Sequence, residues 1–191
     1  MKNNELEKLI NEYEAIIVRC ENLTSGLTVD QLNWKPSPDK WSIAECLRHL
    51  TITNNLYYQN AKPALLAALQ KNISKNKNSP IKFGIIGKIF MGFEPPLKRK
   101  FKVPKVFSPK TKSNTNFSKD VISDFIISKR NMIDLMRKSD SVDLNKVKVS
   151  SPVTKFIRIR LGEYFSIMAP HDRRHLWQAE NVRNLPNFPF V

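Results

Sequence analysis

Apolar residues recur at helical spacing in long stretches of this 191-residue chain. Because positions three or four apart lie on one face of an α-helix, each stretch predicts a helix with one buried side. The stretches cover residues 4–23, 42–69, 119–138 and 161–182, and no run of the chain has the convincing alternation of paired strands. The pattern predicts an all-α fold: a four-helix bundle with a long crossover between helices two and three, in a single domain over residues 1–191.

Residues at the expected helix ends support these boundaries. Ser42 and Glu45 have the spacing of a capping box, in which the serine oxygen accepts a backbone N–H and the glutamate reaches back to the cap. Thr28 and Gln31 have the same form and predict one short helical turn. Pro170 lies inside the last predicted helix, where it removes one backbone hydrogen bond and therefore predicts a bend.

Other local features are expected between the helices. Ser118 is the predicted N-cap of the third helix. The stretch 140–159 is expected to be irregular, with short extended pieces around Val147 and Phe156. The apolar segment 81–93 is broken by three glycines and is too short to cross a membrane. We expect it to pack on its own domain, with a place at a membrane interface as the alternative.

The formal net charge of +15 points to an anionic partner or to a generally basic composition. The positive charge is spread along the chain, which favours a generally basic composition or an anionic small substrate over binding to nucleic acid or an anionic membrane surface. The densest basic run, residues 98–112, is interleaved with prolines and cannot form a basic helix for a DNA groove. Cys20 and Cys46 are too few for a disulfide framework and fit a reducing cytoplasm. No stretch predicts a transmembrane segment.

The chain has three histidines, and their spacing suits a metal site. His171 and His175 lie four apart and therefore project from the same face of a helix. His49, on a facing helix, would complete a face of three nitrogens with open positions for water or substrate. Imidazole ligands suit zinc or nickel, with iron or manganese as alternatives. By itself, His49 also fits a packed core residue. The His171 and His175 pair alone also fits chance helical spacing.

Polar residues near the histidines are candidates to orient a ligand or substrate. Gln178 and Asn181 lie one turn or more beyond His175, with a polar helix seam as the alternative explanation. Arg174, or its neighbour Arg173, is a candidate to hold an anionic group, with a solvated or ion-paired surface as the alternative. Cys46 could approach the site because it lies three residues before a histidine, but a small buried residue is the simpler interpretation.

Two motifs together, Trp41-Ser-Ile-Ala-Glu-x-x-x-His49 and His171-Asp-Arg-Arg-His-Leu-Trp-Gln178, resemble the DinB-like superfamily. The resemblance extends over nearly the whole chain. It implies a metal-binding four-helix bundle related to bacillithiol- and mycothiol-dependent transferases, with His49, His171 and His175 as the metal ligands. Homodimers are common among such relatives, so the resemblance also implies a homodimer. Pro170, directly before His171, is a departure that could alter the aim of this ligand.

The leading hypothesis from these observations is a divalent-metal-dependent enzyme. The bound ion would activate a low-molecular-weight thiol, which then attacks a small electrophile in an S-transferase reaction. Metal-dependent hydrolysis is the alternative chemistry. A non-enzymatic basic module that binds nucleic acid or an anionic membrane surface is a second class, and a purely structural metal site is a third.

Overall fold

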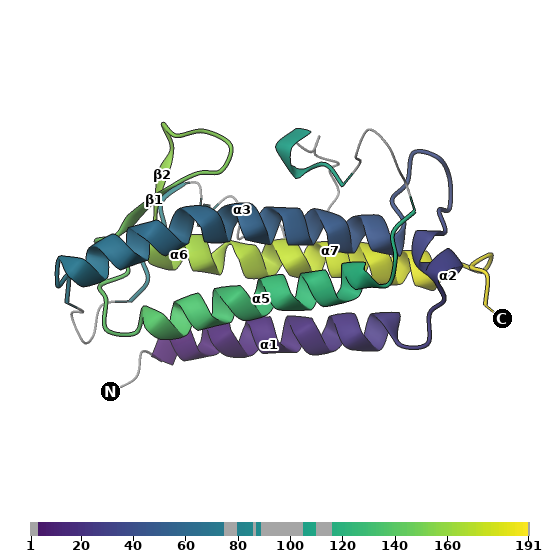
Figure 1. The fold of residues 1–191 in the computed structure, drawn as a ribbon, viewed down its shortest axis with the longest axis horizontal. Helices are drawn as coiled ribbons and strands as arrows, with labels where there is room; N and C mark the ends of the chain where they lie inside the picture. Colours follow the sequence, from purple (N-terminus) through teal and green to yellow (C-terminus); the bar gives the residue numbers. More distant parts are fainter. Residues whose placement is uncertain (1–3, 75–79, 86, 89–104, 110–115, 191) are drawn as a thin grey trace.

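The computed structural model of the chain describes residues 4–74, 80–85, 87–88, 105–109 and 116–190. These residues are mostly helical, with one small two-stranded sheet beside the helices (Figure 1). The predicted all-α class is therefore confirmed. Most of the basic run 98–112, and the end of the apolar segment 81–93, lie outside the described residues.

The long helices lie side by side and enclose the core (Figure 1). They are α1 (Asn4–Thr24), α3 (Ile43–Gln70), α5 (Asp120–Lys138) and α7 (Met168–Arg183). Both α1 and α3 pack against α5 and against α7. The first three begin and end within one residue of the predicted bounds, because amphipathic periodicity decides where such helices can bury a face.

Both predicted capping boxes are present. Thr28 caps the short helix α2 (Val29–Asn33) and Ser42 caps α3, each with both reciprocal hydrogen bonds formed. The prediction that Ser118 is the N-cap of α5 was wrong by one residue: Lys119 occupies that position and makes no side-chain cap bond. The Ser118 hydroxyl still accepts the backbone N–H of Asp120 at 3.3 Å, so it serves the helix end from outside.

The single helix predicted over 161–182 is two helices, α6 (Leu161–Ser166) and α7, which meet at Ile167. The reason is Pro170, which has no N–H for the carbonyl of Ser166. The division places Pro170 in the first turn of α7, where backbone N–H groups have no helical partner in any case. The bend that Pro170 predicted is thus realised as a break between two helices.

The connection before α6 contains the small sheet. Strands β1 (Lys148–Ser150) and β2 (Arg158–Arg160) pair antiparallel, with Val149 opposite Ile159. They lie within two residues of the extended pieces expected around Val147 and Phe156. Between α3 and α5, the described part of the connection includes a short 3₁₀ helix, η1 (Lys105–Phe107).

The beginning of the apolar segment 81–93 packs on the helices. The backbone N–H of Gly87 donates to the buried carboxylate of Glu163 at 2.7 Å, and that of Ile81 donates to Glu5 at 2.6 Å. Within the described part of the chain, no helix is long and apolar enough to cross a bilayer.

Candidate metal centre

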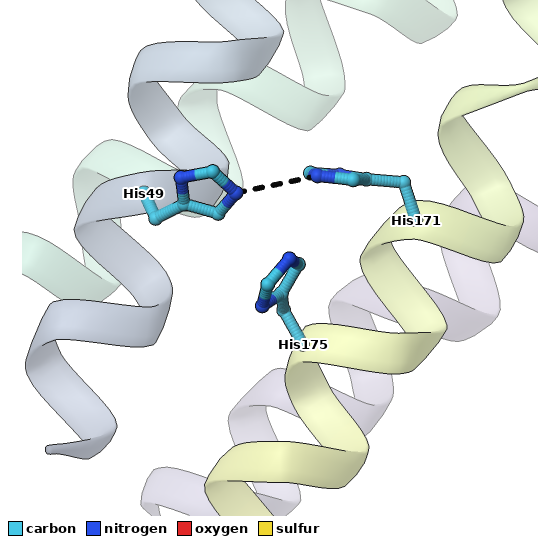
Figure 2. Close-up of side chains that lie close together, drawn as sticks. All are labelled: His49, His171 and His175. Carbon is cyan, nitrogen blue, oxygen red and sulfur yellow. Dashed lines mark hydrogen bonds between the residues drawn. The ribbon is translucent and has the colours of Figure 1, made fainter. Parts of the chain in front are cut away.

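The three histidines lie on two helices that pack against each other. His49 is two turns into α3, and His171 and His175 lie one turn apart near the start of α7. Their rings point toward one another across the gap between these helices (Figure 2). His49 and His175 are buried, and the His171 side chain keeps 16% of its exposure. The three histidines that the spacing argument grouped therefore lie together in the structure.

The ring nitrogens lie at distances that suit one shared ion. One nitrogen from each ring forms a group whose members all lie within 4.8 Å of one another. His49 Nε2 and His171 Nε2 lie 3.2 Å apart. Two metal–nitrogen bonds of about 2.0–2.1 Å at a tetrahedral angle place their nitrogens about 3.3 Å apart. The observed spacing therefore fits a common ion without a large shift of either helix.

The outward nitrogens of two rings already have partners, which fixes their tautomers. His49 Nδ1 lies 2.6 Å from the backbone carbonyl of Phe107, which can only accept, so this nitrogen carries the proton. His175 Nδ1 lies 3.2 Å from Oε1 of Gln178 and donates to it in the same way. In both rings the lone pair is consequently on Nε2. Metal-binding histidines are commonly held by such outer hydrogen bonds.

Burial keeps these two rings in the form that binds metals. Desolvation, followed by the nearby His171 ring, lowers the pKa of His49 to about 4. The same two causes, in the same order, hold the pKa of His175 well below the ordinary value of a histidine. Both rings are therefore neutral at pH 7 and have free lone pairs.

The converging lone pairs need a positive partner. At 3.2 Å, either a proton or a cation must lie between the Nε2 atoms of His49 and His171, because two bare lone pairs repel. One proton satisfies only that pair, whereas the lone pair of His175 points into the same space (Figure 2). The donor set therefore fits a single divalent ion bound by three imidazoles.

A comparison with family models identifies the superfamily of the chain. The model of the DinB superfamily matches residues 12–179, which is most of the chain. The chain belongs to the DinB superfamily. The resemblance drawn from the two histidine motifs is thus confirmed. Neither the curated proteins nor the solved structures gave a match.

The other residues predicted near this DinB triad differ in where they lie relative to it. Gln178 contacts the site through His175, as described above. Arg174 lies close enough to His49 and His175 to lower the pKa of both rings, so it is a cation beside the site. Asn181 is exposed on α7. Arg173 forms an ion pair with Glu12 of α1 at 2.9 Å, so it faces a different helix.

Glu45 and Cys46, which precede His49 on α3, both have structural roles that explain their positions. Cys46 is fully buried, is not a member of the ligand group among the described residues, and burial raises the pKa of its thiol strongly. Glu45 accepts the backbone N–H of Ser42 at 2.9 Å and pairs with Lys35 at 3.1 Å. These contacts assign Glu45 to the helix cap.

The sequence reasoning missed an aromatic wall of the DinB site. The Trp41 indole stacks on His175 with ring centroids 5.6 Å apart, and its centroid lies 5.0 Å from that of His49. Trp41 directly precedes the cap of α3, so the capping box also sets the position of the indole. The position of Trp41 at the start of the motif that contains His49 is the sequence feature that could have indicated this contact.

A buried ion pair beside the triad was also missed. Lys129 of α5 and Asp172 of α7 are both fully buried and joined by a short hydrogen bond. Burial opposes ionisation of Asp172, but the Lys129 ammonium and the neighbouring His171 ring outweigh it and hold the pKa of this carboxyl below its usual value. The available signal was a lysine four residues after Phe125 and three before Met132, within the apolar stripe of its helix.

Proposed function

We propose that this DinB superfamily protein is a divalent-metal-dependent enzyme in which His49, His171 and His175 hold the ion through Nε2. The observation that carries the proposal is the convergence of these nitrogens, two of them with tautomers fixed from outside. Three imidazoles leave at least one position open on the ion, as in catalytic rather than structural sites. Zinc or nickel suits this ligand set best, with iron or manganese as alternatives.

The proposed reaction is transfer of a low-molecular-weight thiol to a small electrophile. When bound, the ion supplies Lewis acidity that keeps a thiol deprotonated near neutral pH. In the transfer, the thiolate sulfur forms a bond to an electrophilic carbon of the substrate, whose leaving group departs with the bonding electron pair. Hydrolysis, with water in place of the thiol, is the second candidate because the same ligand set serves both chemistries.

The residues around the triad have separate roles in this proposal. The Trp41 indole covers His49 and His175 on one side and provides an apolar wall against a substrate. Arg174 supplies positive charge next to the triad and would hold an anionic group of the thiol. Phe107 and Gln178 hold the rings in place from behind.

The proposal also covers the domain organisation, the cellular location and the oligomeric state of the protein. We infer one domain in which α1, α3, α5 and α7 form a four-helix bundle, with the chain between α3 and α5 as its long crossover. We also propose that the protein acts in the cytoplasm as a homodimer.

Metal analysis is the first test of the proposal. We expect untagged protein to contain about one divalent ion per chain by mass spectrometry, and His49→Ala, His171→Ala and His175→Ala each to lose it. Asn181→Ala is the matched control, because Asn181 is exposed on the same helix as two of the ligands. Metal-free wild-type protein that takes up neither zinc nor nickel would contradict the proposed site.

Turnover is the second test and separates the candidate reactions. Metal-loaded protein is incubated with a bimane electrophile and either bacillithiol, mycothiol or glutathione, and the conjugate is quantified by fluorescence. We expect conjugation above the uncatalysed rate with at least one thiol, and loss of that excess in His175→Ala. Hydrolysis of activated esters or amides without any thiol effect would replace transfer with the second candidate.

A further inference from the structure

The buried pair formed by Lys129 and Asp172 lies directly behind one triad ring. Asp172 Oδ1 is 3.7 Å from His171 Nδ1. Both atoms are buried, and within the described residues neither has a hydrogen-bond partner. Because buried polar atoms are nearly always satisfied, two such atoms facing each other point to an interaction that needs only a small adjustment to form.

Each oxygen of Asp172 has a different environment. Lys129 donates to Oδ2, which leaves Oδ1 for the histidine. The ammonium of Lys129 also lies 3.5 Å from the ring centroid of Tyr13, whose hydroxyl donates to the Phe165 carbonyl at 2.8 Å. The lysine is thus fixed between an aromatic face and one carboxylate oxygen. It neutralises the aspartate without occupying the oxygen that faces His171.

This pair crosses the core between two helices. Lys129 comes from α5, which supplies none of the triad histidines, and Asp172 comes from α7. A buried ion pair often contributes no more to stability than apolar residues of the same volume. Its presence at this position, beside His171, is better explained by a role in the site than by stability alone.

We propose that Asp172, neutralised by Lys129, is a positioning residue that holds the proton of His171 on Nδ1 and so reserves Nε2 for the ion. The inference rests on the proposed metal site. His171 is the ring whose tautomer the other contacts leave open, since its Nε2 could instead donate to Nε2 of His49 at 3.2 Å. With a carboxylate behind Nδ1, all three rings of the triad present the same nitrogen to the centre.

The tautomer of His171 can be measured without any metal. With only three histidines, long-range ¹H–¹⁵N NMR spectra of the zinc-free wild-type protein assign each ring directly. We expect a proton on Nδ1 of His171, as for His49 and His175. An Nδ1 of His171 that carries no proton would overturn the inference, because Asp172 would then not determine where the proton of this ring lies.

Paired double variants test the consequence for metal binding. Lys129→Met with Asp172→Leu removes both charges and the acceptor, whereas Lys129→Met with Asp172→Asn removes the charges and keeps an acceptor oxygen of similar size. We expect zinc affinity, measured by chelator competition, to fall about 10–100-fold in the leucine variant. The asparagine variant should recover part of that loss. Circular dichroism confirms that both variants are folded.

The outcomes distinguish the inference from the function beneath it. Wild-type protein that binds no zinc would contradict the proposed metal site. The NMR measurement would still show whether Asp172 holds the proton of His171 on Nδ1. Wild-type protein that binds zinc, together with a folded leucine variant of equal affinity, would overturn only the positioning role. A similar loss in the leucine and asparagine variants would also count against it, because the acceptor oxygen would then be irrelevant.

Discussion

Each triad ring has its outer nitrogen next to a different kind of acceptor. His49 faces a backbone carbonyl, His175 a carboxamide and His171 a carboxylate. Such contacts limit rotation of the imidazoles before an ion arrives, so less conformational entropy is lost on binding. The three rings differ in how firmly they are held, because only the carboxylate contact, at 3.7 Å, is longer than a hydrogen bond.

The position of Trp41 gives a spectroscopic prediction at the scale of single residues. Because the indole lies against His49 and His175, nickel bound by the triad should quench its fluorescence. We expect saturable quenching in the wild-type protein and clearly weaker quenching in Trp41→Phe. Trp177→Phe is the control, since this indole is more than a third exposed on α7. Quenching that survives in Trp41→Phe and disappears in Trp177→Phe would put the ion elsewhere.

At the scale of helices, local chemistry decides where each element begins. Ser42 fixes the start of α3 through its capping box and thereby the register of His49 and the position of Trp41. Pro170 divides α6 from α7 and lies in the first turn of the helix that carries the other two histidines. The residues that end and begin helices therefore also set the geometry of the site.

The cap of α3 can be tested with a matched pair of variants. Ser42→Ala should lower the free energy of unfolding by about 1 kcal/mol, because it leaves a buried N–H of the first turn unpaired. Thr28→Ala removes the equivalent cap from α2, which carries no histidine. We expect urea denaturation to show a loss of similar size in both, with about one metal per chain retained. An unchanged stability in Ser42→Ala would show that the cap contributes nothing.

These elements also show which parts of the site could be predicted from sequence. Helix ends and the His171–His175 pair depend on residues three or four apart, so short-range patterns reveal them. The contact between His49 and Phe107 spans 58 positions and that between Lys129 and Asp172 spans 43. Neither pair leaves a periodic signal, because the partners meet only when the helices pack.

Across the whole molecule, the triad joins only two of the long helices. The core extends along α1, α3, α5 and α7, and its buried apolar residues far outnumber the three histidines. Burial of apolar surface is the largest favourable contribution to folding. The metal is therefore expected to add stability to a chain that is already folded, unlike a zinc finger, in which binding and folding are one event.

Thermal unfolding of the whole chain tests this expectation. After complete chelation, circular dichroism should still show a helical protein with a cooperative transition. Adding zinc to a free concentration of about 100 times its dissociation constant should stabilise the protein by about 2.7 kcal/mol, seen as a rise in Tm. His175→Ala should unfold as the chelated wild type does, with no response to zinc. A chelated wild type that loses its helical signal would instead assign the ion a structural role and remove the main argument for catalysis.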